Sequence, residues 1–213
     1  CCIISHCILK NNAVRGLVAG TTCVIEHTSA CGNTGQYGIM AGDDSVLRHC
    51  TANGNTGSGG FSRGISLGKG CSAIACNANN NKGATKDPTG SFGVGIYATS
   101  DCLIKNCTVK GNDGDGIRVG SNNRIEENQS VKNGAAGIRV TGDCNRVDSN
   151  HCGANDHGIY FGGATGNFII RNSSLKNTST QFFRNGPGNT APSHNISGGA
   201  ISDNPWENFY LNN

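Results

Sequence analysis

Apolar residues recur along this chain with a period of about 21 residues. The clearest copies begin at the Gly-Ile pairs of Gly116, Gly137 and Gly158, which lie 21 residues apart. In each copy two apolar residues flank an outward one, and a polar turn, a further apolar residue and an Asn follow. A period this short cannot hold two packed helices, so it predicts one turn of a β-solenoid per repeat.

The repeat extends over most of the chain. A Gly followed by an apolar residue marks the first strand of each turn, at Gly16, Gly38, Gly64, Gly95, Gly116, Gly137 and Gly158. Inward and outward positions alternate there, as in a half-buried strand. The inward pairs are Leu17/Ala19, Ile39/Ala41, Ile65/Leu67, Ile96/Ala98, Ile117/Val119, Ile138/Val140 and Ile159/Phe161.

Two more short strands per turn are predicted from apolar positions that share an offset. The second strand is marked by Ile4, Ile25, Leu47, Ala73, Ile104, Ile125 and Val147, and the third by Leu9, Ala30, Ala52, Ala78, Val109, Ser130 and Cys152. Three short strands per turn describe an all-β parallel β-helix, whose turns stack roughly 4.8 Å apart. We expect about eight turns over residues 1–178, right-handed because that crossover dominates between parallel strands.

The period is lost towards the C-terminus. Residues 179–213 contain three prolines and Trp206, the single tryptophan. The last turn of a solenoid exposes apolar side chains and unpaired strand edges. We therefore predict that residues 179–213 form an irregular cap, with Trp206 and Phe209 on the last turns. The alternative is an aromatic ligand-binding patch.

Composition and charge narrow the classes of function. A net charge of +3 and twelve aromatic residues offer little to nucleic acid, so no nucleic-acid partner is expected. No apolar run is long enough to span a membrane. Because the chain begins without Met and inside a repeat, we expect sequence upstream of Cys1.

Twelve cysteines would ordinarily suggest a disulfide framework, but here they follow the repeat. Cys2, Cys23, Cys71 and Cys102 share one offset, and Cys7, Cys50, Cys76 and Cys107 share another, with Asn at the same offsets elsewhere. We interpret them as small buried residues with mostly free thiols, since the repeat already supplies order. Disulfides between adjacent turns are the alternative, because such pairs lie within bonding reach.

The Gly-Ile and Asn-x-Ile-x-x-Asn repeats resemble those of the bacterial right-handed parallel β-helix repeat proteins, the group with NosD-type and pectate-lyase-like folds. The resemblance covers residues 1–178 and rests on Gly116-Ile117, Asn123-Arg124-Ile125, Asn128, Gly137-Ile138, Asn145-Arg146-Val147, Asn150 and Gly158-Ile159. The group includes polysaccharide lyases, polygalacturonases, uronan epimerases, phage tailspikes and surface proteins. The resemblance therefore implies the fold and leaves the function open.

One outward row on the first strand is a candidate binding surface. Its members, at one offset on four consecutive turns, are Tyr97, Arg118, Arg139 and Tyr160. Stacked arginines repel each other unless anions or carboxylates compensate, and Asp115 and His157 flank the row. Guanidinium groups beside tyrosine rings suit a uronate or sulfated glycan. The alternative is a solvated strand face.

Two longer turns and an acidic pair bear on a catalytic alternative. The longer turns, Gly57–Arg63 and Gly83–Val94, are predicted to form a wall beside Tyr97. Asp43 and Asp44 resemble the acidic pair of polygalacturonases, but Arg63 occupies the position of the histidine and no Arg-x-Lys follows. Two carboxylates without these partners do not make a hydrolase, and Asp is common in turns.

The metal candidates are weak. His6, His27 and His49 share one offset near a turn, where imidazoles could bind a transition metal, but a chance ladder is the simpler interpretation. No cofactor is predicted. A lyase would use Ca²⁺, and Asp101, Asp115 and Asp143 are too dispersed to form its site.

These patterns favour an extracellular or cell-surface β-helix that acts as a scaffold or binds polysaccharide without a complete catalytic set. End-to-end self-association is a further expectation. The alternative function is a polysaccharide lyase or glycoside hydrolase acting on an anionic glycan.

Overall fold

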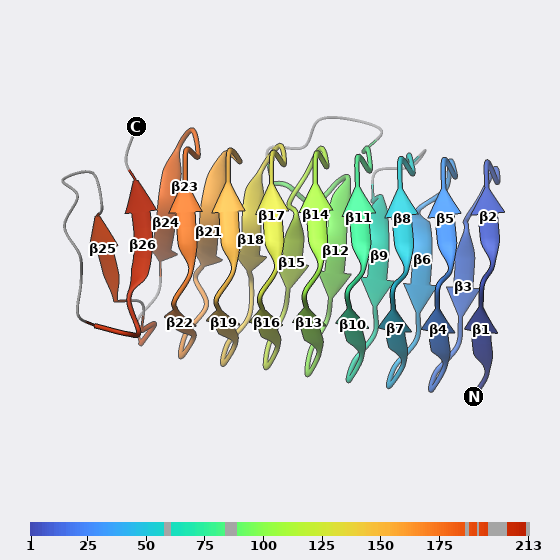
Figure 1. The fold of residues 1–213 in the computed structure, drawn as a ribbon, viewed down its shortest axis with the longest axis horizontal. Coiled ribbons are helices and arrows are strands. Elements are labelled where there is room, and N and C mark those ends of the chain that lie inside the picture. The colour runs from blue at the N-terminus through green and yellow to red at the C-terminus, as the bar shows by residue number, and fades with distance from the viewer. Residues whose placement is uncertain (58–60, 84–88, 186–187, 191, 196–203, 212–213) are drawn as a thin grey trace.

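A computed structural model describes residues 1–57, 61–83, 89–185, 188–190, 192–195 and 204–211. These segments form a straight stack of about eight turns, with the two ends of the chain at opposite ends of the stack (Figure 1). Every element in them is a strand, and they contain no helix that could cross a membrane. The predicted all-β parallel solenoid is confirmed.

Three parallel sheets run the length of the stack. Sheet A contains β1(Ile3–Ser5), β4(Val24–Glu26), β7(Val46–Arg48), β10(Ser72–Ile74), β13(Leu103–Lys105), β16(Arg124–Glu126), β19(Arg146–Asp148) and β22(Phe168–Ile170). Sheet B contains β2(Ile8–Lys10), β5(Ser29–Cys31), β8(Thr51–Asn53), β11(Asn77–Asn79), β14(Thr108–Lys110), β17(Gln129–Val131), β20(His151–Gly153), β23(Ser173–Leu175), β26(Asn208–Leu211) and β25(Ser193–Asn195). Sheet C contains β3(Leu17–Ala19), β6(Tyr37–Ala41), β9(Arg63–Leu67), β12(Val94–Ala98), β15(Ile117–Val119), β18(Ala136–Val140), β21(His157–Gly162) and β24(Thr180–Asn185).

The core is a set of apolar columns inside this triangular tube. Sheet A contributes Ile25, Leu47, Ala73, Ile104, Ile125, Val147 and Ile169, all fully buried. Sheet B contributes small residues, among them Ala30, Ala52 and Ala78. Each strand is paired in register with the next turn, so equivalent residues stack and the predicted inward positions are confirmed. Burying one apolar stripe per strand is the main stabilising term for such a thin fold.

Buried asparagines join the turns at all three corners. The longest ladder lies between sheets B and C; it begins at the exposed Asn12 and continues through the buried Asn33, Asn55, Asn81, Asn112, Asn133, Asn155 and Asn177. Each side-chain oxygen accepts from the backbone N–H and the side-chain amide of the preceding turn. The ladder thus satisfies backbone groups that the corners remove from the sheets. The predicted asparagines at the other two corners also form ladders, as the bonds from Asn123 to Asn145 and from Asn128 to Asn150 show, whereas the ladder between sheets B and C was not predicted.

Eight of the cysteines take the place of asparagine at the other two corners, whereas Cys31 and Cys152 lie within strands of sheet B. Cys107 donates its thiol to the carbonyls of Ala73 and Lys105, while its own N–H is bound by Asn128 on the next turn. All twelve cysteines are unbridged in the structure, and seven of them are buried. Their burial agrees with the interpretation of cysteines as compact residues of the interior. The sulfur atoms of Cys2 and Cys23 lie 3.0 Å apart.

The parallel sheets continue past residue 178, the predicted end of the β-helix. Strand β24 pairs with β21 in sheet C, and β26 pairs with β23 in sheet B. Trp206 lies against one of the last turns, as predicted, since the Arg171 guanidinium is 5.3 Å from the centroid of its ring, but the residue stays 48% exposed. Phe209, in β26, is partly buried. The C-terminal segment therefore adds strands to the stack before any irregular cap, and Pro187 lies outside the described residues.

Candidate functional site

The predicted row lies on the outer face of sheet C. Tyr97, Arg118, Arg139 and Tyr160 are direct partners in the strand register, so their positions are confirmed. Pairing with β9 extends the row to Ser66.

Asp115 resolves the repulsion between the two arginines. Its side chain is completely buried and accepts hydrogen bonds from Arg139 Nε, at 2.8 Å, and from the Ala136 N–H, at 3.0 Å. Arg118 Nη1 approaches the same carboxylate at 3.4 Å. One carboxylate therefore holds two guanidinium groups, which leaves a net positive charge on this part of the surface.

Burial raises the pKa of Asp115 to about 6, against the opposing effects of Arg139, the Ala136 N–H and Arg118. The carboxyl group consequently changes charge close to neutral pH. Asp115 supports the arginines from below and is not itself presented to solvent.

Both tyrosines of the row support guanidinium groups. Arg139 lies 4.2 Å from the centroid of the Tyr160 ring, and Arg63 lies 3.5 Å from that of Tyr97. Such stacking holds the flat cations in place while their edges stay able to donate hydrogen bonds. One face of each ring is therefore covered by an arginine.

Arg63, the last residue of the longer turn predicted to lie beside Tyr97, is itself a member of the site. It begins β9, and its Nη1 donates to Ser66 at 3.1 Å. Its Nε is buried and makes no hydrogen bond to a described residue. Arg63 precedes the Gly of its Gly-Ile pair, as Asp115 does, and this shared offset was the available signal.

The two longer turns border the row, as predicted for the parts that the structure describes. Phe61 and Phe92 pack edge to face with ring centroids 5.3 Å apart. Ser91 accepts a 2.6 Å hydrogen bond from Arg118. Residues of the longer turns and of the row together line a cleft of about 230 Å³; they are Phe61, Arg63, Ser91, Tyr97, Arg118 and Thr141. Residues 58–60 and 84–88 of these turns lie outside the described residues.

His157 lies at the end of the row beside Tyr160, with ring centroids 5.3 Å apart. Its Nδ1 is 2.8 Å from the Thr180 hydroxyl, and its Nε2 is 3.5 Å from Asp156. The row therefore ends in His157 and Tyr160, next to the Arg139 guanidinium; both are residue types that serve as general acids or bases in enzymes.

The acidic pair Asp43–Asp44 lies at the turn between β6 and β7 and serves the backbone there. Asp43 accepts a 2.7 Å hydrogen bond from the Lys69 N–H, and Asp44 adopts a left-handed conformation with φ of 56°. This is the turn role that competes with the hydrolase interpretation.

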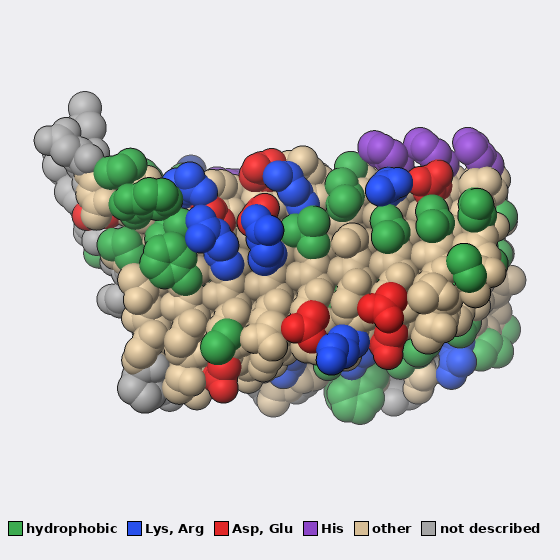
Figure 2. Space-filling model, turned by 90° about the horizontal axis from the view of Figure 1, so that it is seen from below, with side chains coloured by type: hydrophobic (Ala, Val, Ile, Leu, Met, Phe, Trp, Pro, Cys, Tyr) green, Lys and Arg blue, Asp and Glu red, His purple; other side chains and the backbone are tan. Residues whose placement is uncertain are grey.

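The three predicted histidines form an exposed stack along one edge of the molecule (Figure 2). The rings of His6 and His27 are 5.1 Å apart, and those of His27 and His49 are 5.0 Å apart, with nearly parallel planes. Parallel stacking directs ring faces towards each other instead of aiming nitrogen atoms at one point. Among the described residues, no group of three or more His, Cys, Asp or Glu side chains is placed to hold a metal ion.

Solved structures with the same fold include two enzyme modules from Azotobacter vinelandii. The mannuronan C-5 epimerase AlgE4 A-module superposes with a TM-score of 0.71 at 19% identity, over 88% of this chain and 57% of that one. The AlgE6 A-module of the same enzyme class gives 0.62 at 17% identity, over 88% and 56%. The chain thus spans less than two thirds of these modules, and the likeness shows the fold alone. No curated protein sequence matches the chain.

A protein-family model also matches the sequence of this chain. It matches residues 92–204, which are just over half of the chain and include β12 to β25. The match also confirms the predicted handedness. This chain belongs to the family described as the right-handed beta helix region.

Proposed function

We propose that the outer face of sheet C binds an anionic polysaccharide, with the guanidinium groups of Arg118 and Arg139 as the anchors for its acidic groups. The observation that carries this proposal is the placement of two adjacent arginines over one buried carboxylate. Both Nη atoms of Arg139 and Nη2 of Arg118 make no hydrogen bond to a described residue. These atoms are donors available to carboxylate or sulfate groups.

The surrounding geometry supports a chain-like ligand. The row crosses four consecutive turns, which at roughly 4.8 Å per turn extends over a length comparable to several sugar units. Phe61 and Phe92 form an apolar wall along one side of it. The structurally similar epimerase modules act on mannuronan according to their names, and this supports a uronate as the repeating unit. An extracellular or cell-surface location goes with this proposal.

We infer that binding takes place without turnover. A hydrolase would place two carboxyl groups on either side of the bond to be cleaved. In the described part of this groove, the carboxylate of Asp115 is fully buried beneath two arginines. The competing function, proton abstraction by a lyase or epimerase, draws support from His157 and Tyr160 beside Arg139.

The test is calorimetric titration of the protein with a mannuronate oligosaccharide, together with product analysis. The variant Arg118→Gln should weaken binding on the order of tenfold, because a charge-assisted hydrogen bond contributes about 1.5–3 kcal/mol. Arg139 still holds Asp115 in that variant, so the fold is retained. Arg48→Gln, on sheet A, is the matched control and should leave the affinity unchanged.

Equal affinity of wild type and Arg118→Gln would contradict the binding site. Unsaturated or epimerised products that disappear in Tyr160→Phe would instead establish the competing enzymatic function.

The affinity should depend on pH through Asp115. As the pH falls through about 6, the carboxyl group gains a proton and ceases to neutralise Arg118 and Arg139. Removing one negative charge near an anionic ligand is worth roughly a tenfold gain in affinity. We expect mannuronate to bind more tightly at pH 5 than at pH 7.5. Asp115→Asn should bind tightly at both values, and an unchanged pH dependence in that variant would rule out Asp115 as its source.

A further inference from the structure

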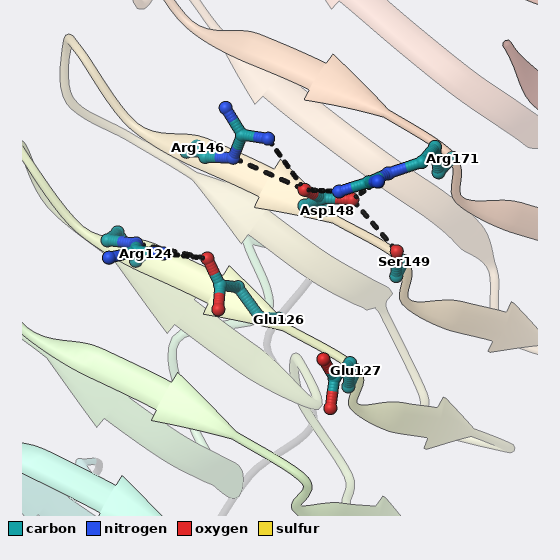
Figure 3. A pocket seen from close by; sticks show the side chains of 7 residues that line it. All are labelled: Arg124, Glu126, Glu127, Arg146, Asp148, Ser149 and Arg171. Atoms are coloured by element: carbon teal, nitrogen blue, oxygen red, sulfur yellow. Dashed lines mark hydrogen bonds and ion pairs between the residues drawn. The ribbon is translucent and has the colours of Figure 1, made fainter. Parts of the chain in front are cut away.

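A second cluster of arginines lies on another face of the molecule, the outer side of sheet A. Basic and acidic side chains gather there towards the C-terminal end, beside exposed apolar side chains (Figure 2). Arg124 and Arg146 are direct register partners on β16 and β19, and Arg171 follows β22 (Figure 3). They border a cavity of about 320 Å³, whose lining is completed by Glu126, Glu127, Asp148 and Ser149. This site shares no residue with the row on sheet C.

Asp148 organises the cluster, and its oxygens are fully engaged. Oδ1 accepts from Arg171 Nε at 2.7 Å and from the Ser149 hydroxyl at 2.8 Å. Oδ2 accepts from Arg146 Nη2 at 2.8 Å and from Arg171 Nη2. Burial opposes ionisation of this side chain, but the bonds from Arg171, Ser149 and Arg146 outweigh it and lower its pKa to about 2.

Each of the three arginines keeps donors that the described residues do not use. The Nη1 atoms of Arg124, Arg146 and Arg171 make no hydrogen bond to a described residue. In Figure 3 one nitrogen of Arg146 points away from Asp148. The arginine side chains are 38–65% exposed, whereas those of Asp148 and Glu126 are 6% and 12% exposed. The surface of the cluster is therefore mostly guanidinium, with Asp148 and Glu126 beneath it, while the Glu127 side chain is 49% exposed and is paired with Lys105.

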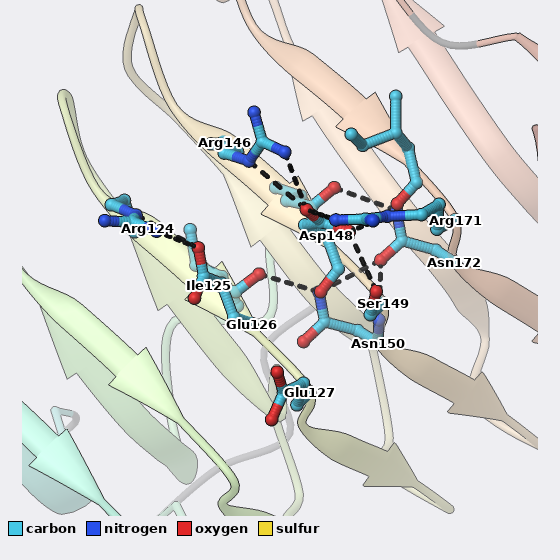
Figure 4. Close-up of polar contacts among 12 residues, drawn as sticks. Arg124, Ile125, Glu126, Glu127, Arg146, Asp148, Ser149, Asn150, Arg171 and Asn172 are labelled. Carbon is cyan, nitrogen blue, oxygen red and sulfur yellow. Dashed lines mark hydrogen bonds and ion pairs between the residues drawn. The ribbon is translucent and has the colours of Figure 1, made fainter. Parts of the chain in front are cut away.

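The guanidinium groups are held before any ligand arrives. Arg146 lies 5.4 Å from the centroid of the Phe168 ring, and Arg171 lies 5.3 Å from that of Trp206. Below them, Asn150 bonds the Ile125 carbonyl and Asn172, which fixes the spacing of the strands (Figure 4). A site whose side chains are already ordered loses less conformational entropy on binding.

The local charge balance favours an anion. Asp148 carries one negative charge between two arginines. Glu126 is shared by Arg124 and Lys105, and Glu127 lies 3.2 Å from Lys105. Four cations thus surround three carboxylates, and the surplus charge lies at the surface. A surface ion-pair ladder alone would not require three sets of unused donors at one cavity.

We propose that Arg124, Arg146 and Arg171 form a binding site for a tetrahedral oxyanion, the sulfate or phosphate group of a small molecule or of a glycan ester. Donors reach the cavity from three separate side chains on three turns. A tetrahedral group offers acceptors in several directions and matches such an arrangement, whereas a planar carboxylate is satisfied by one guanidinium fork. The site is independent of the function proposed for sheet C.

The experiment is a titration of the full chain with sodium sulfate and with sodium phosphate at constant ionic strength, followed by calorimetry and thermal unfolding. We expect saturable binding that weakens on the order of tenfold in Arg124→Gln and in Arg146→Gln, the loss of about one charge-assisted hydrogen bond. Arg48→Gln removes one exposed arginine from the same face of sheet A and should bind as wild type does. Circular dichroism establishes that each variant is folded.

A second arm separates the free ion from the ester. A sulfated disaccharide and its desulfated counterpart are titrated in the same way, and tighter binding of the sulfated form than of inorganic sulfate identifies the glycan ester as the ligand. Equal binding of both sulfate sources assigns the site to the free ion. Affinity that falls equally in Arg48→Gln, or that does not saturate, would overturn the proposal, because either result describes general electrostatic attraction.

Discussion

Replacing Asn112 with alanine is expected to lower the free energy of unfolding by about 4 kcal/mol. The side-chain oxygen of Asn112 accepts from the N–H and the side-chain amide of Asn81, at 2.9 and 3.0 Å. Its amide donates to the Ala78 carbonyl and to Asn133, both at 2.9 Å. All these groups are buried, so truncation leaves two donors and one carbonyl without partners, each at a cost of about 1–3 kcal/mol.

Urea denaturation of the Asn112→Ala variant measures this effect, and hydrogen exchange shows whether the loss spreads from the central turns. Asn77→Ala is the matched control, because Asn77 is exposed on the outer face of β11 and its side chain makes no hydrogen bond to a described residue. We expect the control to change stability by less than about 0.5 kcal/mol. A loss below about 1 kcal/mol for Asn112→Ala would show that water replaces the ladder.

The second large effect is expected for Gly116→Ala. A Cβ atom at this position would lie 2.0 Å from the Ser130 hydroxyl oxygen and 2.7 Å from the carbonyl oxygen of Gly137. The first contact can be relieved by a side-chain rotation, but the second is with the backbone of the next turn. The two turns must separate, and we expect a loss of about 3 kcal/mol or more.

Thermal and urea unfolding measure this loss, with Gly20→Ala as the comparison. A Cβ atom at Gly20 meets nothing within 4 Å, and the residue does not have a positive φ. Alanine there should leave stability unchanged or raise it by about 0.4–1 kcal/mol, since it restricts the unfolded chain. If both variants melted at the wild-type temperature, close packing between turns would not explain the repeated glycine.

The same close packing explains why the repeat could be identified from the sequence. The Gly of each Gly-Ile pair is required by the approach of the next turn, and the apolar residues after it are required by the narrow core. Both demands recur at each turn with the same spacing. A pattern produced by local periodicity and burial can be identified without coordinates.

The candidate sites were only partly predictable. The register of Tyr97, Arg118, Arg139 and Tyr160 follows from the period, because equal offsets place side chains in one row. The period does not predict the conformation of each surface side chain or the residues that it contacts. Arg63 covers Tyr97 from a different offset, and Asp115 is buried under the arginines instead of flanking them.

The cluster on sheet A was missed for a related reason. Arg124 and Arg146 share an offset in the sequence, but Arg171 belongs to the turn after β22 and Trp206 to the C-terminal segment. Residues from three different places in the sequence pattern meet there because long side chains cross between neighbouring offsets.

The sequence by itself determined the repeat, the three strands of each turn, the inward columns and the alignment of the surface row. Backbone geometry and apolar burial impose the same requirements at every turn, so the same residue types recur along the chain with a fixed period. Only the tertiary structure decided that Asp115 neutralises two arginines, that Asp148 gathers Arg146 and Arg171, and that the sheets continue beyond residue 178. These outcomes depend on side-chain direction and on individual contacts between turns, which no period encodes.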